Sequence, residues 1–334
     1  MNEFIPSITK AGSSDKRIKT TSKNKKKNRQ QSPFFKQLSR QRSLLFMCLP
    51  FVVLVFIFNY LPLWGWLMAF QNYKPHLGVR GSEWVGLKHF KDLFSDKSFW
   101  LVLRNTLAMS SLKLVFGFLS AIILAILLNE LHVEWFKRTV QTISYLPYFI
   151  SWVVAANLVM TALSSEGGII NELLMFLGII DQPKLWLGTP RYFWWIIVFS
   201  DMWKNVGWNA IIYLSAMTSI DPELYEAANI DGAGRLKRIW HITLPGIRPV
   251  FTVLLIMNLG WILNAGFEHQ LLLMNPIVRE VAEVIDIFVL RYGINMGRYS
   301  FATAAGIFKS LVSIIMLVTA DLIVQKLNGD EEVL

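Results

Sequence analysis

Four charged residues stand out because they lie inside long apolar stretches of the sequence: Lys113, Asp201, Lys204 and Lys309. An ionised side chain among apolar groups is costly unless it is paired, so such residues usually face a partner or a water-filled cavity. A buried lysine ammonium can bind an anion, or a carboxylate or backbone carbonyls can satisfy it. Asp201 precedes Lys204 by three residues, which places both on one helix face and predicts an ion pair.

Aromatic and amide side chains occur in the same stretches. Asparagine amides donate and accept hydrogen bonds, and aromatic rings offer flat apolar faces. These properties suit a hydroxyl-rich ligand, and the candidates are Trp203, Trp208, Trp261, Phe267, Asn205, Asn209, Asn258 and Asn264, with Glu268 as a further counter-ion. Helix packing or anchoring at an interface is the alternative interpretation of each tryptophan. The histidines lack metal-ligand spacing and Cys48 is the single cysteine, so we predict no metal site.

Six apolar runs are the elements that must position these residues. The sequence is 54% hydrophobic and only 17% charged, and a helix of roughly 20 apolar residues crosses ~30 Å of hydrocarbon. The first run is too long for a signal-peptide core and has no clear cleavage site, so we expect it to be retained. We predict an all-α membrane protein with six transmembrane helices, at about Leu44–Phe70, Asn105–Leu128, Val140–Leu163, Tyr192–Met217, Val250–Leu271 and Phe301–Val324.

The positive charge predicts the orientation of these helices. The net charge is +10, and twelve lysines and arginines lie before residue 43. Basic residues beside a membrane helix are held in the cytoplasm and contact anionic lipid, so this tail does not indicate nucleic-acid binding. We expect a disordered basic cytoplasmic tail over 1–42, a transmembrane domain over 43–326 and a short cytoplasmic tail over 327–334. Both termini are then cytoplasmic.

Five segments join the six runs and differ in their expected place, and the shortest, HVEWFKR at 132–138, falls in the cytoplasm. The segments 71–103, 164–191 and 272–299 fall outside, with short helices expected in the middle of the second and over 281–293. The segment Asp221–Pro249 falls in the cytoplasm. There Asp221 is a suitable N-cap, Pro222 suits the first helical turn, and Gly232 can end a helix with a left-handed backbone. We predict a second short helix at 236–241 that ends before a proline at 245.

The spacing within Asp221–Pro249 matches a known motif. Glu226, Ala227 and Ala228 are followed after three residues by Gly232, and after nine more by Ile-Thr-Leu-Pro at 242–245. This order resembles the EAA motif of bacterial ABC importer permeases. The resemblance implies the type I permease fold and a coupling helix that docks on an ATPase subunit through these four residues. A helix that merely links two spans is the alternative from physics alone.

The resemblance covers about residues 42–326 and extends to the LplB-like polysaccharide permeases of Gram-positive bacteria, through NYKPHLGVRGSEWVGLKHF and EVIDIFVLRYG among other stretches. It implies a multi-pass protein of the cell membrane that forms a heterodimer with a second permease. It also implies two copies of a cytoplasmic ATPase, which hold ATP and Mg²⁺, and an extracellular lipid-anchored sugar-binding protein. The sequence has no G-x-x-x-x-G-K-[ST] phosphate loop of its own, so we expect no catalysis in this chain.

These observations leave two questions open. The residues expected to line the path are Lys113, Asp201, Trp203, Lys204, Trp208, Trp261, Asn264, Glu268 and Lys309. Surplus lysine charge there favours an acidic, uronate-containing oligosaccharide, whereas lysines held by ion pairs or carbonyls would only fix helix packing. An ion-coupled secondary sugar transporter is the alternative function, although no internal repeat is evident. A membrane-embedded enzyme is less consistent, because no cluster of catalytic carboxylates or histidines occurs.

Overall fold

The computed structural model describes residues 41–328, and the chain divides into two units at 1–61 and 62–334. The described part of the first unit is helix α2 (Arg42–Val55) with a following π-helical turn (Phe56–Tyr60). The second unit contains the residues of the candidate site, and its helices surround several apolar clusters. The predicted tails at 1–40 and 329–334 lie outside the described residues.

The second unit is almost entirely helical. A two-stranded antiparallel ribbon near its start pairs Gln71 with Trp84 and Asn72 with Glu83. In chain order its elements are β1 (Gln71–Asn72), α3 (Gly78–Gly81), β2 (Glu83–Trp84), α4 (Lys88–Ser95), α5 (Lys97–Glu130), α6 (Glu134–Tyr145), α7 (Trp152–Ala162), α8 (Ile169–Phe176), α9 (Pro190–Thr218), α10 (Pro222–Ile230), α11 (Arg235–Arg238), α12 (Leu244–Gly260), α13 (Phe267–Leu273), α14 (Arg279–Ala282), α15 (Ile285–Leu290) and α16 (Tyr299–Asn328).

Within residues 41–328, four helices are long and apolar enough to cross a membrane, or five if a bent pair forms one span. The four are Arg42–Phe70, Lys97–Glu130, Arg235–Gly260 and Tyr299–Lys326. The predicted fourth span corresponds to α9, a continuous helix of 29 residues that carries polar and charged side chains in its middle. The helical class is confirmed, and the count of six spans and the cytoplasmic termini stay predictions.

The predicted third span is broken. It corresponds to α6, a 3-10 turn (Leu146–Phe149) and α7, and the two parts meet at an angle of 107°. Pro147 lies in the turn, and the Ser151 side chain caps α7 by accepting from the Val154 backbone N–H. Because the helical hydrogen-bond ladder stops at this bend, backbone carbonyls become available to other donors.

The predicted fifth span is also misplaced. The helix ends at Gly260, and α13 starts only after an irregular stretch that closes at Gly266. The backbone of Gly266 has φ +95°, a left-handed value that glycine adopts without a Cβ penalty. In the other direction the helix extends back to Arg235, because a π-helical turn (Ile239–Thr243) connects α11 to α12.

The predicted helix at 236–241 is therefore wrong at its C-terminal end, because the helix continues beyond residue 241. Pro245 lies directly after the π-helical turn, and the helix continues past it instead of ending there. The first half of the segment is as predicted: Asp221 Oδ1 accepts from the Glu223 N–H at 2.9 Å, and Gly232 has φ +71° just after α10.

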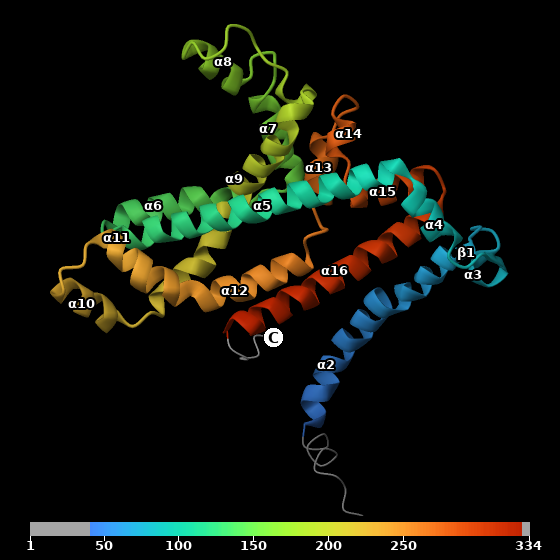
Figure 1. Cartoon of the computed structure of the whole chain (residues 1–334), viewed down its shortest axis with the longest axis horizontal. Coiled ribbons are helices and arrows are strands. Elements are labelled where there is room, and N and C mark those ends of the chain that lie inside the picture. The colour runs from blue at the N-terminus through green and yellow to red at the C-terminus, as the bar shows by residue number, and fades with distance from the viewer. Residues whose placement is uncertain (1–40, 329–334) are drawn as a thin grey trace, which may run out of the picture. The chain divides into compact units, whose positions relative to one another are not determined.

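Close helix packing positions the middle of the unit. Helix α5 packs along α9, and α12 runs beside α16 (Figure 1). A Cβ at Gly207 would overlap the backbone carbonyl oxygen of Ser144, so glycine lets α9 approach the end of α6 closely. Helices α10 and α11 lie at one end of α5, and α13–α15 lie toward the other (Figure 1).

The predicted outer segments contain short helices held by buried polar side chains. Helix α8 confirms the helix expected in 164–191, and α14 and α15 form the one expected over 281–293 as two pieces. Buried Asn105 of α5 donates to the carbonyls of Glu280 and Glu283 at 2.8 and 3.2 Å. Its neighbour Thr106 accepts from the Ile285 N–H at 3.0 Å. These bonds fix α14 and α15 onto α5.

Candidate functional site

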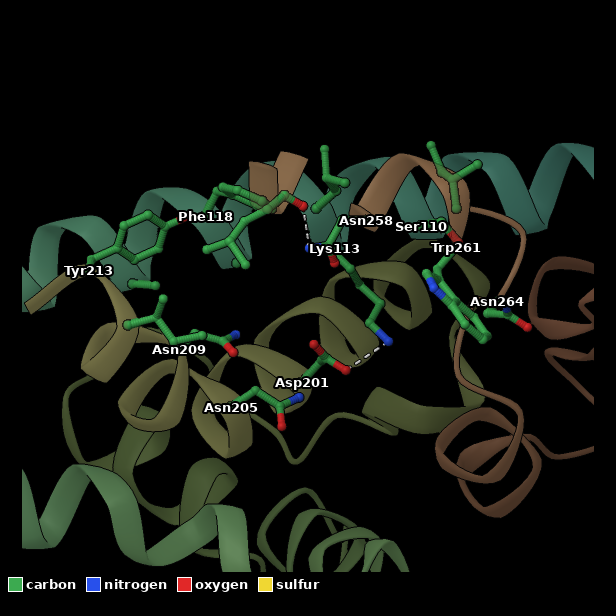
Figure 2. Close-up of a pocket in the computed structure, with 16 residues that line it drawn as sticks. Ser110, Lys113, Phe118, Asp201, Asn205, Asn209, Tyr213, Asn258, Trp261 and Asn264 are labelled. Carbon is green, nitrogen blue, oxygen red and sulfur yellow. Dashed lines mark hydrogen bonds and ion pairs between the residues drawn. The ribbon is translucent and has the colours of Figure 1, made fainter. Parts of the chain in front are cut away.

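A cavity of about 330 Å³ lies between α5, α9 and α12 and reaches the irregular stretch after α12. Its polar lining consists of amides, a serine, a tyrosine hydroxyl, a lysine and an aspartate (Figure 2). The lining residues are Ser110, Lys113, Leu114, Gly117, Phe118, Ala121, Asp201, Asn205, Asn209, Ile212, Tyr213, Leu254, Asn258, Trp261, Ile262 and Asn264. A chamber with apolar walls, several amides and one pair of opposite charges can hold a hydroxylated ligand in a defined orientation.

Lys113 and Asp201 form the ionic centre of this cavity. The two side chains point toward one another across the space between α5 and α9, with Lys113 Nζ 2.7 Å from Asp201 Oδ1 (Figure 2). Lys113 Nζ also donates to the Ala265 carbonyl at 3.2 Å, just before the left-handed Gly266. Both side chains keep about a sixth of their surface exposed, at 16% and 18%. The pair is therefore accessible from the cavity.

The predicted pair of Asp201 with Lys204 is wrong. Lys204 is buried and donates instead to the carbonyls of Tyr148 and Pro147, at 2.8 and 3.4 Å. Its ammonium also lies over the rings of Tyr148 and Trp152, at 5.4 and 5.3 Å from their centroids. The break between α6 and α7 frees these carbonyls, and a lysine donor satisfies them. The packing interpretation therefore fits Lys204.

Lys309 belongs to a neighbouring cluster. Its Nζ lies 2.5 Å from Asp286 Oδ1 and 2.5 Å from Asn264 Oδ1. Asn264 and Asp286 line a second cavity of about 740 Å³, together with residues of α16 and the aromatic side chains of Trp66, Phe267 and Tyr299. Asn264 lines both cavities, so it lies between the Lys113–Asp201 and Lys309–Asp286 pairs.

The remaining predicted path residues divide between these places. Trp261 lines the first cavity and is 68% exposed. Trp208 instead stacks face to face on Tyr148, with centroids 4.4 Å apart, and Trp203 is an exposed residue of α9 that does not line either cavity. Glu268 is exposed on α13 and lines neither cavity.

Sequence analysis did not single out four residues in or beside the site: Trp152, Ser200, His269 and Asp286. His269 is buried beside Asp201, Trp152 stacks on its ring with centroids 4.0 Å apart, and Ser200 hydrogen bonds to its Nε2 at 2.8 Å. Asp286 likewise comes from an outer segment that returns toward the cavity. A lone histidine in an apolar stretch carries no spacing signal, and only the breaks in the third and fifth spans bring Trp152 and His269 together.

The motif residues in α10 present an exposed surface. Glu226, Ala227 and Gly232 are exposed and Ala228 is half-buried. Apolar side chains surround them on α10, α11 and the π-helical turn: Leu224 at 53%, Ile230 at 87%, Leu236 at 73% and Trp240 at 67% exposure. Arg238 holds α11 against α10 by donating to Asn229 Oδ1 at 2.5 Å.

Comparison with known proteins relates this architecture to one family. Residues 113–329 match the family described as "Binding-protein-dependent transport system inner membrane component". The "Polygalacturonan/rhamnogalacturonan transport system permease protein YteP" of Bacillus subtilis is 45% identical over 295 residues, 88% of this chain and 91% of the relative. "Protein LplB" of the same organism is 43% identical over 293 residues, 88% of this chain and 92% of the relative.

A solved structure gives the same result in three dimensions. A chain of a bacterial ABC transporter involved in the import of the acidic polysaccharide alginate superposes with a TM-score of 0.81 at 40% identity. The match covers 88% of this chain and 98% of the alginate transporter chain. The chain described here therefore belongs to the binding-protein-dependent transport system inner membrane components, the membrane permease subunits of ABC transporters.

Proposed function

We propose that this chain is the permease subunit of an ATP-driven importer for acidic, uronate-containing oligo- or polysaccharides, and that it forms half of the translocation path. The observation that carries the proposal is the cavity centred on the Lys113–Asp201 pair. Relatives described as a polygalacturonan/rhamnogalacturonan permease and an alginate importer support the acidic class.

The amides and the lysine of the cavity suit the chemistry of a uronate. The amide groups of Asn205, Asn209 and Asn258 can donate to and accept from sugar hydroxyls, and the exposed face of Trp261 can cover a sugar ring. A uronate carboxylate can take the place of the Asp201 carboxylate as the partner of Lys113. Lys113 and Asp201 balance one another in charge, so an incoming carboxylate competes with Asp201 for Lys113.

The coupling proposal rests on the exposed surface of α10. Family resemblance assigns Glu226, Ala227, Ala228 and Gly232 to docking on an ATPase, and the apolar side chains around them remain uncovered in the isolated chain. Small side chains permit close approach, while large exposed apolar groups gain free energy when a partner covers them. The ATPase, a cytoplasmic protein holding ATP and Mg²⁺, would be present in two copies.

The remaining partners follow from the family. A second permease would complete the path as a heterodimer, and a lipid-anchored sugar-binding protein outside the cell would deliver the cargo, in the membrane of a Gram-positive bacterium. The alginate transporter structure in complex with an alginate pentasaccharide-bound periplasmic protein supports such a delivery partner, at the same 0.81 TM-score. Membership in an ABC transporter family favours this function over an ion-coupled secondary transporter.

Uptake by the whole reconstituted transporter tests the proposal. Proteoliposomes holding the permease pair and ATPase would be given ATP inside, the binding protein outside, and either an oligogalacturonide or its carboxyl-reduced neutral analogue. We expect wild-type protein to prefer the acidic sugar and Lys113→Met to lose that preference. Lys204→Met is the matched control, because Lys204 is bound to backbone carbonyls away from the cavity. Equal loss of preference in both variants, or none in Lys113→Met, would refute the site.

A further inference from the structure

The Asp201 carboxylate has a second neighbour besides Lys113. His269 Nδ1 lies 3.9 Å from Asp201 Oδ1, the same oxygen that accepts from Lys113 Nζ at 2.7 Å. The distance from the histidine is too long for a hydrogen bond. His269 is only 1% exposed, and its Nδ1 is buried without a hydrogen-bond partner among the described residues. A buried polar atom left without a partner beside a carboxylate requires an explanation.

From the hydrogen bonds of Ser200 we assign the proton of the neutral ring to one nitrogen. The Ser200 hydroxyl donates to the Ile196 carbonyl at 2.6 Å, so its oxygen is left to accept. It therefore accepts from His269 Nε2–H, at 2.8 Å. A neutral imidazole has one N–H, which Nε2 now carries, so Nδ1 presents a lone pair to the Asp201 carboxylate. Two acceptors face one another, and a proton on Nδ1 would join them.

Some groups around the ring favour a proton on Nδ1, and Lys113 opposes it. From α7 the Trp152 ring stacks on the imidazole, and an aromatic face attracts a cation. From α9 comes Asp201, and from α5 comes Lys113, whose positive charge opposes a second cation nearby. Helix α13 itself carries exposed Glu268, and α15 carries Asp286, which is paired with Lys309. Burial is the larger reason that the ring is neutral, and the positive charge of Lys113 is the second. Of the two, only the effect of Lys113 changes when a ligand draws this side chain away from Asp201.

We propose that His269 binds a proton and replaces Lys113 as the ion-pair partner of Asp201 when a uronate carboxylate draws Lys113 away. Binding of an acidic sugar to the permease would then take up one proton. The inference rests on the proposed function. The proton comes from water and adds to the Nδ1 lone pair, giving an imidazolium paired with Asp201. It returns to water when the sugar leaves and Lys113 pairs with Asp201 again. His269 is a positioning residue, since it acts through Asp201 rather than on the sugar.

Proton uptake predicts a particular pH dependence. When binding takes up one proton, the apparent affinity for the acidic sugar falls as pH rises, by about tenfold per pH unit at the limit. A carboxyl-reduced sugar leaves Lys113 on Asp201 and therefore takes up no proton. The ratio of KM for the acidic sugar to KM for its neutral analogue isolates this effect, because changes in the ATPase or the binding protein with pH enter wild type and variants equally.

The experiment measures that ratio between pH 6 and 8.5 in proteoliposomes of the whole transporter, with an oligogalacturonide and its carboxyl-reduced analogue. We expect the wild-type ratio to rise with pH and the His269→Gln ratio to be flat. In Ser200→Ala the Nε2 proton no longer has its acceptor and can move to Nδ1, where it faces Asp201 without uptake of a proton from water. The KM ratio of this variant should therefore rise less steeply with pH than that of wild type. His132→Gln, at an exposed histidine in the loop between α5 and α6, should behave as wild type.

The outcomes distinguish failure of the role of His269 from failure of the proposed function. A wild-type ratio that favours the acidic sugar but does not change with pH overturns the role of His269 alone. The same holds if His269→Gln keeps the wild-type slope or, should that variant fail to assemble, if Ser200→Ala keeps it. A wild-type transporter that treats both sugars alike at every pH overturns the proposed function itself.

Discussion

The Lys113–Asp201 pair should show a large coupling energy in a double-mutant cycle. At 2.7 Å separation, the attraction of two unit charges is about 6 kcal/mol for an effective dielectric constant of 20. Desolvation offsets much of this attraction, because both side chains are more than four-fifths buried. We therefore expect a net coupling of about 1–3 kcal/mol, within the range of about 0.5–3 kcal/mol for residues in direct contact.

The cycle uses Lys113→Met, Asp201→Asn and the double variant. Either single change leaves a buried polar partner unsatisfied and should lower the free energy of unfolding by about 3 kcal/mol. This value is at the low end for a buried pair, because the cavity is large enough for water to reach the remaining partner. The double variant should lose clearly less than the sum of the two. The assay is chemical unfolding of the purified transporter in detergent, followed by fluorescence of a dye on Trp203→Cys in a Cys48→Ser background, a position on α9 outside the cavity. Losses that add within about 0.5 kcal/mol would show that the two groups do not interact.

Three further predictions concern stability. Lys204→Met should destabilise by about 2–4 kcal/mol, since two carbonyls at the α6–α7 break lose their donor, and an unchanged unfolding midpoint would contradict that contact. Gly207→Leu should cost about 1–3 kcal/mol by forcing α9 away from the Ser144 carbonyl, whereas Gly306→Leu, with open space around it, should cost less in the same assay. Burial lowers the pKa of His89 on α4 below its ordinary 6.5. The unfolded chain then binds a proton that the folded chain does not, so stability should fall as pH drops through 6.5, and His89→Gln should remove this loss in melting curves from pH 7.5 to 5.5.

Much of the helical framework was predictable because membrane burial leaves a strong length signal. The runs that became α5, α9 and α16 were placed within a few residues at one end or both, since each is a continuous helix. The cap at Asp221 and the left-handed Gly232 followed from local backbone chemistry, which requires no tertiary contact. Family membership followed from the spacing of the motif in the same segment.

The breaks in the third and fifth spans were not predictable from hydropathy. An apolar run reads the same whether the helix continues or bends, and Pro147 alone does not give the 107° turn. The glycine at 266 could have signalled the second break, because an isolated glycine in an apolar run can mark a left-handed residue. These bends decide the site: one supplies the carbonyls that bind Lys204, and the other brings Ala265 and His269 to Lys113 and Asp201.

The charges illustrate the same limit. The sequence predicted that buried lysines need partners, and each described one has them. The choice of partner depended on which helices pack together, since Asp201 prefers a lysine on α5 to one on its own helix. The sequence predicted surplus lysine charge along the path, but the cavity contains one lysine and one aspartate, which form a pair. The proposed selection for an acidic ligand would instead depend on exchange of one carboxylate for another at Lys113.

Cysteine labelling tests most directly whether acidic sugar enters the cavity. In a Cys48→Ser background, Asn205→Cys and Asn258→Cys place a thiol in the lining, and Trp203→Cys places one outside it. A positively charged thiol reagent would be applied to the whole transporter with saturating oligogalacturonide or its carboxyl-reduced analogue. We predict that the oligogalacturonide slows labelling at 205 and 258 but not at 203, and that the neutral analogue protects far less. Equal labelling with and without the acidic sugar at both lining positions would contradict the account.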